Sequence, residues 1–301
     1  MSLEPRDLAR LHKRYPLRRA LVTGAGSGLG RALAIALARH GWSLLLNDNA
    51  PDRLASVAQA CRSTGALVTE AMFDVADLDA HRPFADLFLR QHGGIDLVFT
   101  CAGIGVGGEF LDTQSAHIRE VVDVNLLGTI WAGKVFLPPM VAAGRGHFVT
   151  IASAAAYHGL PSIAAYAATK AAVVALSETL RSELKPHGVD VTVKMTTFYI
   201  SDIAEFTRGS DDNREKARSL VQMAPWSSEA VADALLLNVQ SRKFYMVAPG
   251  QARFLWRFKR LLPEAYLRLM PALFSKLEAK LLAKASWQRG QDIAQVNGGP
   301  G

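Results

Sequence analysis

The sequence predicts an α/β fold: a doubly wound parallel sheet of about seven strands, followed by a helical extension at the C-terminal end. Three observations predict it. Apolar runs alternate with helical patterns from residue 20 onward, a glycine-rich loop follows the first run, and the composition changes after residue 250 to leucine, aromatic and basic residues. Strands that are apolar at every position are typical of parallel sheets with helices on both faces. Ligands of such sheets bind at the carboxyl ends of the strands.

The expected strands follow in order along the chain. They are residues 20–22, 42–46, 66–72, 95–100, 146–152, 189–195 and 244–247, and an apolar helix over 31–39 follows the first. We expect three regions: a basic N-terminal segment over 1–18, a single Rossmann-type domain over 19–250, and an amphipathic basic helical extension over 251–301.

Composition narrows the class of protein. Half of the 301 residues are hydrophobic, which is enough for a sizeable core. No uninterrupted apolar run of about 18 residues occurs, so we expect no membrane-spanning helix, and the N-terminus lacks the apolar core of a signal peptide. Cys61 and Cys101 are too few for a disulfide framework, so a cytoplasmic protein is expected. The eight histidines are scattered, and we expect no metal site.

The net charge of +7 is unevenly distributed. Residues 1–19 carry six basic and two acidic residues, residues 252–284 carry eight and two, and residues 20–251 carry a net −3. A basic stripe can serve a nucleic acid, a membrane surface or only a solvated face. Nucleic-acid binding is disfavoured, because the basic residues of the C-terminal stripe alternate with leucine and phenylalanine rather than forming a polar arm.

The loop from Thr23 to Gly30, Thr-Gly-Ala-Gly-Ser-Gly-Leu-Gly, predicts a binding site for a dinucleotide pyrophosphate. Glycine permits positive φ and close approach of a phosphate, and the helix that begins here offers free N–H groups. No Gly-Lys-Ser/Thr follows, so this is not a nucleotide-triphosphate loop. The predicted contacts are Gly24, Ser27, Gly28, Leu29 and Gly30.

Asp48 ends the second strand, 18 residues beyond Gly30. A carboxylate here accepts hydrogen bonds from the adenosine ribose and repels a 2′-phosphate. Asn49 follows where an arginine would have favoured that phosphate. NAD is therefore expected as cofactor, with NADP less favoured.

Ser153 stands thirteen residues before Tyr166, which with Lys170 forms the run Tyr-Ala-Ala-Thr-Lys. A tyrosine–lysine pair alone is a weak signal, but the glycine loop, the serine and the pair in this order are a strong one. Free tyrosine has a pKa of about 10, too high for a base at neutral pH. A lysine ammonium one helical turn away and a positive nicotinamide ring would favour the phenolate.

These residues resemble the short-chain dehydrogenase/reductase family over about residues 19–249. Thr23, Gly24, Gly28 and Gly30 match its cofactor loop, and Asp74-Val75 match its usual adenine contact. The family's four catalytic positions correspond to Asn125, Ser153, Tyr166 and Lys170.

The resemblance implies roles for these side chains. Tyr166 would exchange the proton, Ser153 would hold the substrate oxygen, and Lys170 would also hold the nicotinamide ribose. Asn125 would fix a water that relays protons. The family's habit of pairing the helices of Asn125 and Tyr166 implies a homodimer or homotetramer.

Two motifs depart from the family pattern. Thr100-Cys101-Ala102-Gly103 replaces Asn-Asn-Ala-Gly, and Cys101 cannot give the amide hydrogen bonds that asparagine gives. Cys101, Ala102 and Gly103 are still expected to line the cofactor site. Thr196-Thr197 replaces Pro-Gly, and the nearby Ile200 and Ser201 are expected to contact the nicotinamide carboxamide.

The expected activity is hydride transfer between NAD(P) and a secondary alcohol, ketone or aldehyde. Residues 202–226 should cover the substrate. Tyr157, Phe198 and Tyr199 would suit an apolar lipid-, steroid- or retinoid-like compound, or would be ordinary packing residues. Two alternatives stay open: an epimerase or dehydratase on the same four residues, and a non-catalytic NAD-binding regulatory module.

The C-terminal extension has the period of an amphipathic helix. Its apolar positions are Phe254, Phe258, Leu261, Leu262, Met270, Phe274, Leu277 and Leu281. Its polar positions are mainly Arg257, Lys259, Arg260, Arg268, Lys276, Lys280 and Lys284. Pro263 and Pro271 should divide it into short helices. Two interpretations stay open: a peripheral contact with an anionic membrane over 252–284, or a helix packed on its own core or a partner subunit.

Overall fold

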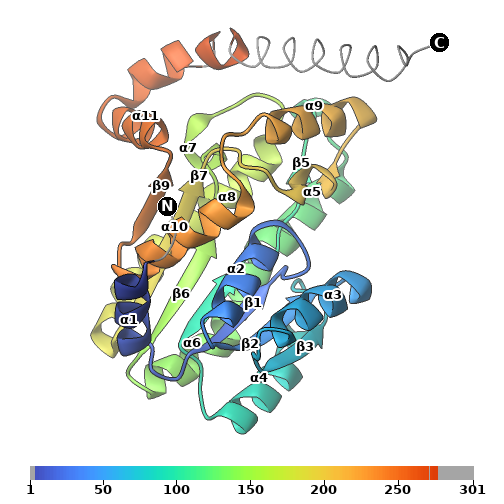
Figure 1. The fold of residues 1–301 in the computed structure, drawn as a ribbon. Coiled ribbons are helices and arrows are strands. Elements are labelled where there is room, and N and C mark those ends of the chain that lie inside the picture. Colours follow the sequence, from blue (N-terminus) through green and yellow to red (C-terminus); the bar gives the residue numbers. More distant parts are fainter. Residues whose placement is uncertain (1–3, 271, 277–301) are drawn as a thin grey trace, which may run out of the picture.

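Seven parallel strands form the central sheet, as the sequence predicts (Figure 1). The computed structural model describes residues 4–270 and 272–276. The strand order is β3-β2-β1-β4-β6-β7-β9. The strands are β1 (Arg19–Thr23), β2 (Ser43–Asp48), β3 (Val68–Met72), β4 (Leu97–Thr100), β6 (Gly146–Ile151), β7 (Val189–Thr196) and β9 (Tyr245–Ala248). The order reverses between β1 and β4, which opens a crevice at the carboxyl ends of these strands.

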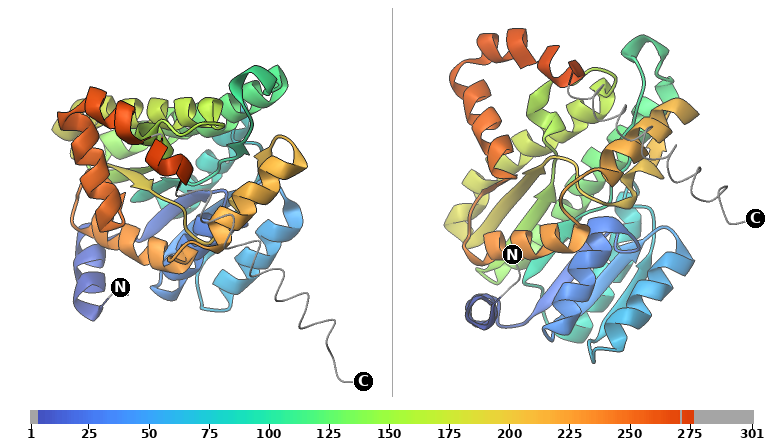
Figure 2. Two further views of the ribbon diagram at one scale, coloured as in Figure 1. Left: turned by 90° about the horizontal axis from the view of Figure 1, so that it is seen from above. Right: turned by 45° about the horizontal axis from the view of Figure 1, so that its top comes forward.

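Two layers of helices cover the sheet (Figure 2). On one face pack α2 (Gly28–Arg39), α3 (Pro51–Arg62) and α10 (Ser228–Gln240). On the other pack α4 (Leu78–His92), α6 (Gly128–Ala142) and α8 (Ala164–Leu184). Successive strand residues therefore face different cores: Phe148 packs on the second face and Val149 on the first. Helices cover both faces of the sheet, which explains why most of its strands are continuous apolar runs in the sequence.

Small elements complete the described chain. They are η1 (Phe110–Asp112), α5 (Ser115–Val122), α7 (Ala155–His158), η3 (Lys185–His187), η4 (Asp202–Ala204) and α9 (Asp211–Gln222). A two-stranded sheet of β5 (Gly105–Val106) and β8 (Thr207–Arg208) was not predicted, because two-residue strands leave no periodic pattern. It joins the loop after β4 to the segment that follows β7.

The basic N-terminal segment is partly anchored on the domain. It contains α1 (Pro5–Arg14), from which Leu11 packs in the first core. Tyr15 follows the helix and is buried, and its hydroxyl shares a 2.7 Å hydrogen bond with Nδ1 of His147 on β6. Only part of this segment is therefore a solvated basic surface.

One continuous helix, residues 115–142, is long and apolar enough to cross a bilayer by length and composition alone, which the sequence argument did not anticipate. It comprises α5, a π-helical turn over Asp123–Leu127, and α6. Its buried side chains include Ala132, Phe136 and Met140, which pack in the second core. The apolar composition is thus used in packing against the sheet.

The C-terminal extension begins with α11 (Gly250–Leu261), which lies beside β9 and α7 (Figure 1). Residues 263–270 and 272–276 are also helical, so the predicted break at Pro263 is present. Ala252 and Tyr266 are buried, whereas Phe254, Leu261 and Leu262 are exposed. The predictions for Pro271 and for residues 277–301 fall outside the described residues.

Candidate active site

A cleft of about 530 Å³ opens at the carboxyl ends of β1, β2 and β4. Gly24 adopts a φ of +61°, and a Cβ there would lie 2.7 Å from Cα of Ala102, so the glycine loop lies directly against the segment after β4. Gly28 also has a positive φ, +47°. The predicted residues that line the cleft are Gly24, Ser27, Gly28, Leu29, Gly30, Asp48, Asp74, Val75, Cys101, Ala102, Gly103 and Ser201.

Asp48 is fixed at the tip of β2, where it is buried. Its Oδ2 accepts a hydrogen bond from the Gly26 N–H at 2.9 Å, and its Oδ1 accepts one from the Ala50 N–H at 3.0 Å. A Cβ on Gly26 would lie 2.8 Å from Oδ2, so this glycine is needed for the approach. Backbone N–H groups thus fix the position of the Asp48 carboxylate.

Arg53 lies beside Asp48 and was missed by the sequence analysis. Its Nη2 is 3.2 Å from Oδ1 of Asp48, and its guanidinium lies 4.9 Å from the ring centroid of Phe206. All three residues line the cleft. The sequence gives only a weak signal for this pair, because four residues separate Arg53 from Asp48. The first turn of α3 brings the two side chains together in space.

The N-terminus of α2 already binds a carboxylate of the same chain. The Gly28 N–H donates to Oδ2 of Asp202 at 2.9 Å, across 174 residues of sequence. Free N–H groups and the helix dipole make this end of a helix attractive to anions. Asp202 therefore occupies part of the place that a pyrophosphate would take.

Tyr166 and Lys170 project from one side of α8, one turn apart. Lys170 Nζ lies 5.6 Å from the ring centroid of Tyr166 and donates to the Ile151 carbonyl at 3.0 Å. Lys170 is 5% exposed, and burial lowers its pKa to about 8. Ile151 lines the cleft, so Lys170 lies behind that part of the wall, although neither Lys170 nor Tyr166, both predicted cofactor contacts, is itself among the lining residues.

Ser153 follows β6 and faces Tyr166. Burial raises the pKa of Tyr166, and a hydrogen bond from Ser153 opposes that rise. The Ser153 Oγ also accepts a hydrogen bond from the Ala155 N–H at 3.1 Å. The sequence argument expected Lys170 to favour the phenolate. In the structure burial is the larger effect, and the Lys170 ammonium is directed to the Ile151 carbonyl.

Asn125 is buried in the π-helical turn between α5 and α6. Its Oδ1 accepts a hydrogen bond from the Ile104 N–H at 2.9 Å, and its Nδ2 donates to the Ile104 carbonyl at 3.0 Å and to Thr169 Oγ1 at 3.3 Å. A Cβ on Gly103 would lie 3.1 Å from Oδ1 of Asn125 and 3.5 Å from Nζ of Lys170. The four predicted catalytic side chains thus converge; single-turn π-bulges of this kind are frequent at functional sites.

The departure at Cys101 leaves the loop after β4 supported by other groups. Burial raises the pKa of the Cys101 thiol to about 12, so it is a neutral thiol. The Ala102 N–H donates to Thr23 Oγ1 at 3.1 Å, and Asn125 holds Ile104 from the other side. Thr23 and Asn125 therefore stabilise the segment that Cys101 does not.

Of the four residues that the sequence singles out in the segment after β7, two line the cleft. Ser201 and Tyr199 line the cleft, whereas Phe198 and Ile200 are about half exposed, at 47% and 49%, and do not line it. Tyr157 is buried in the second core and donates to the Ala252 carbonyl at 3.4 Å. The structure therefore favours the interpretation of Tyr157 as an ordinary packing residue.

Residues 202–226 lie beyond the strand ends, near α5 and β5 (Figure 1). Arg208 donates two hydrogen bonds to the carboxylate of Glu120 on α5, at 2.8 and 2.6 Å. Asn213 Nδ2 donates to the Gly107 carbonyl at 3.2 Å. These contacts hold the segment over the cleft. Over the described ranges, no three His, Cys, Asp or Glu side chains gather as a metal site would.

Comparison with known families explains this arrangement. Residues 18–211 match the family described as short chain dehydrogenase. The chain belongs to that family. The match covers the glycine loop and all four converging side chains, so the resemblance seen in the sequence is confirmed.

Relatives in the family are named as oxidoreductases. The chain is 32% identical to "Probable oxidoreductase EphD" of Mycobacterium tuberculosis over 81% of its own length and 43% of that protein. It is 30% identical to "Putative oxidoreductase SadH" of the same species, over 88% and 95% of the two chains. It is 28% identical to human "Estradiol 17-beta-dehydrogenase 11", over 83% and 81%. The chain thus spans less than half the length of the EphD relative.

Solved structures of the family share the fold. A short-chain dehydrogenase/reductase from Burkholderia phymatum, in complex with NAD, superposes with a TM-score of 0.75 at 28% identity, covering 81% of this chain and 94% of that one. The seven-stranded, doubly wound sheet predicted from the sequence is therefore the architecture of this family.

Proposed function

We propose that the chain transfers a hydride between a nicotinamide cofactor and a secondary alcohol, ketone or aldehyde. The observation that carries the proposal is the convergence of Ser153, Tyr166, Lys170 and Asn125 beside Ile151 and Gly103, two residues that line the cleft. The glycine loop, the α2 N-terminus and the anchored Asp48 fit a dinucleotide. When bound, the cofactor supplies the hydride acceptor or donor.

In this mechanism the chain's own residues handle the proton. The Tyr166 phenolate takes the alcohol proton in oxidation, and the Tyr166 hydroxyl gives one in reduction. Ser153 lowers the pKa of Tyr166 and hydrogen-bonds the substrate oxygen. Lys170 contributes a positive charge beside the phenol, and Asn125 fixes the backbone that carries the inner wall of the cleft.

NAD is the cofactor that we favour over NADP. The Asp48 carboxylate is held at the tip of β2 by two backbone N–H groups, so a 2′-phosphate would meet a fixed negative charge. Arg53 weakens this preference, because its guanidinium is within 3.2 Å of the same carboxylate. The relative crystallised with NAD agrees with the proposal without deciding it.

The substrate that we propose is an apolar alcohol or ketone of the lipid, steroid or retinoid class. Ile104, Phe206 and Tyr199 line the cleft, and Phe198 and Ile200 lie exposed beside it. The relative named as an estradiol dehydrogenase acts on a compound of this class. An epimerase or dehydratase would use the same four residues, and turnover without net oxidation of added alcohol would favour it.

The test is a screen of apolar alcohols and ketones with NAD, NADH, NADP and NADPH, following the absorbance of the reduced cofactor. We expect turnover with at least one apolar pair, and more with NAD(H) than NADP(H). Tight binding of a cofactor with no turnover of any alcohol or ketone would favour a non-catalytic NAD-binding module.

We also propose that α11 and the helical residues after it rest on an anionic membrane surface. Within the described chain, six of the thirteen exposed large hydrophobic side chains lie between residues 254 and 273. Phe254, Leu261 and Leu262 are 69%, 78% and 56% exposed, so packing on the chain's own core does not account for them. Exposed apolar residues next to basic ones suit an interfacial helix.

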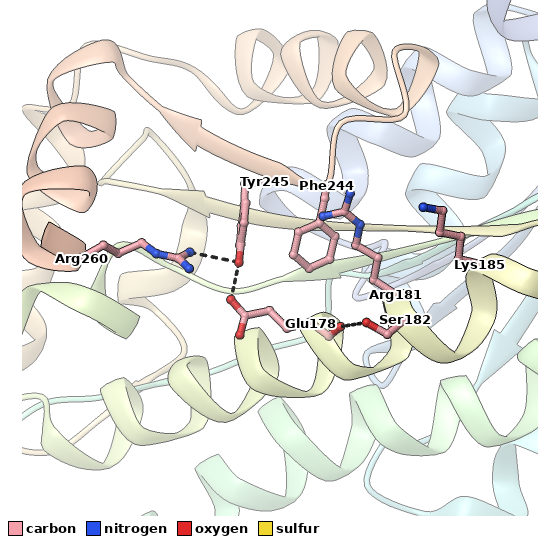
Figure 3. A pocket seen from close by; sticks show the side chains of 7 residues that line it. All are labelled: Glu178, Arg181, Ser182, Lys185, Phe244, Tyr245 and Arg260. Atoms are coloured by element: carbon pink, nitrogen blue, oxygen red, sulfur yellow. Dashed lines mark hydrogen bonds between the residues drawn. The ribbon is translucent and has the colours of Figure 1, made fainter.

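A basic hollow beside α11 supports the same proposal (Figure 3). It has a volume of about 380 Å³ and is lined by Arg181, Lys185 and Arg260 together with one carboxylate, Glu178. The Tyr245 hydroxyl donates to Glu178 and accepts from Arg260 at 3.2 Å. With three basic side chains and one carboxylate, the hollow has an excess of positive charge. An anionic lipid headgroup complements that charge. A second copy of this chain is the alternative occupant, in line with the oligomer that the family resemblance implies.

A further inference from the structure

A second lysine is buried beside the site, and the mechanism above does not use it. Lys194 lies near the carboxyl end of β7 and is 2% exposed. In the sheet it is paired with Ile151 of β6 on one side and Met246 of β9 on the other. Both neighbours belong to the first core, so Lys194 stands in an otherwise apolar row.

The Lys194 ammonium has no anionic partner among the residues that the structure describes. Its Nζ lies 4.2 Å from the ring centroid of Tyr199, a cation–π contact. It takes part in none of the ion pairs found in this part of the chain. Buried lysines are rare and are normally paired with an acid. An unpaired one beside a cleft therefore points to a charge-dependent role.

Lys194 lies at the end of the cleft opposite Asp48. Cys101, Ile151 and Tyr199 surround it and line the cleft. Asp48 ends β2 and Lys194 lies on β7, four strand spacings away, or about 19 Å at about 4.8 Å per strand. Lys170, the family's ribose-binding lysine by resemblance, donates to the carbonyl of the same Ile151. An adenosine ribose at Asp48 would thus leave the nicotinamide end at Lys194.

We propose that Lys194 biases the bound cofactor toward its reduced form and so favours alcohol oxidation in the hydride-transfer step. The oxidised nicotinamide ring carries a positive charge and the reduced ring is neutral. An ammonium in a poorly hydrated wall repels the first and not the second. The inference rests on the nicotinamide cofactor of the proposed function and adds a direction to it.

The bias has a defined pH dependence. Burial lowers the pKa of Lys194 to about 7. The groups that face it from other elements are Cys101 and Tyr199, both neutral because burial raises their pKa, and Lys170, whose pKa is about 8. The repulsive charge is present below pH 7 and is lost as the pH rises through it. NAD+ binding should therefore lower the pKa of Lys194 more than NADH binding does.

The experiment measures Kd for NADH and for NAD+ by titration at pH 6 and pH 9. The proteins are the wild type, Lys194→Met, and the control Lys134→Met, which removes an exposed lysine of α6. At pH 6 we expect Lys194→Met to lower the ratio of the NAD+ Kd to the NADH Kd by about tenfold, with no change in the control. Between pH 6 and pH 9 the ratio should fall further in the wild type than in Lys194→Met, which retains Lys170.

A charged replacement tests whether the positive charge of Lys194 carries the effect. Lys194→Arg should retain a high ratio at both pH values, since arginine stays protonated. Thermal unfolding checks the fold, and Lys194→Met should not lower Tm, because it replaces an unpaired buried charge by an apolar side chain. An unchanged ratio in folded Lys194→Met at pH 6 would overturn the inference. Failure of both cofactors to bind the wild type would overturn the proposed function with it.

Discussion

At the scale of single residues, the proposed chemistry depends on the pKa of Tyr166. Burial raises it, the Ser153 hydrogen bond lowers it, and Lys170 is directed to the Ile151 carbonyl. Burial and the Ser153 hydrogen bond thus act on the pKa of Tyr166 in opposite directions. Ser153 is then more than a substrate contact, because it acts on the proton donor directly.

Ser153→Ala removes the hydrogen bond that opposes the effect of burial. We expect the pKa of Tyr166 to rise, so the ascending limb of the pH profile of kcat/KM for alcohol oxidation should move to higher pH. The rate at neutral pH should fall by about 10²- to 10³-fold, the usual cost of losing one such donor. Cofactor Kd serves as the control and should not change. A smaller rate with an unmoved limb would show that Ser153 contacts only the substrate.

Asp48→Ala removes the carboxylate that a 2′-phosphate would meet. Arg53 then loses its partner and becomes free to bind that phosphate, so we expect the ratio of NADP Kd to NAD Kd to fall by about tenfold or more. The matched control is Asp52→Ala, which removes an exposed carboxylate from the first turn of α3, the helix that carries Arg53. If the wild type already binds NADP more tightly than NAD, the role given to Asp48 is wrong.

At the scale of secondary-structure elements, long apolar patterns were predictable and short or strained ones were not. The seven strands were found to within a few residues, because burial on both faces imposes a continuous apolar run. The helix expected over 31–39 begins at Gly28, since its first turn is built from glycines that apolar periodicity ignores. The π-helical turn around Asn125 and the β5–β8 pair carry no local pattern at all.

The candidate site shows the same division. The glycine loop, Asp48 and the four converging side chains are marked by spacing along the chain. Arg53, Lys194 and the contact of Asp202 with Gly28 depend on which segments the fold brings together, and no spacing rule marks them. Family resemblance does not mark them either: Lys194 is one of several polar residues that alternate with apolar ones along β7.

Asp202 and the N-terminus of α2 form a contact that a bound pyrophosphate would have to replace. Asp202→Asn removes the competing negative charge, so NAD should bind about two- to fivefold more tightly, in line with the energy of a charge at a helix end. Asp212→Asn, in the first turn of α9, is the control and should have no effect. Weaker NAD binding in Asp202→Asn would mean that the carboxylate helps to hold the segment closed over the cofactor.

At the scale of the whole molecule, positive charge is unevenly distributed along the chain. Residues 20–251 are net negative, and the basic residues gather at the N-terminal segment and in the extension. In the extension they accompany exposed leucines and a phenylalanine. A peripheral membrane contact there would deliver an apolar substrate to the protein from the lipid phase.

Vesicle co-sedimentation tests the membrane proposal. The full chain should sediment with anionic vesicles at low salt, remain in solution with neutral ones, and be released by salt, since each basic group near the surface contributes about 1 kcal/mol. Phe254→Asp and Leu261→Asp should weaken binding, whereas Leu67→Asp, at an exposed leucine outside the extension, should not. A full chain that stays in the supernatant with anionic vesicles, and whose oligomer dissociates in the two extension variants, would assign this surface to a second copy instead.

The most direct test of the central claim is the substitution Tyr166→Phe, measured for turnover and cofactor affinity with the active substrate pair from the screen. The account predicts that turnover is abolished while the Kd for NAD is nearly unchanged, because the phenol is needed only to move the proton. Lys170→Ala should damage both quantities, since Lys170 is also expected to hold the nicotinamide ribose. Retained turnover in a folded Tyr166→Phe protein would contradict the assignment of Tyr166 as the proton-transfer group.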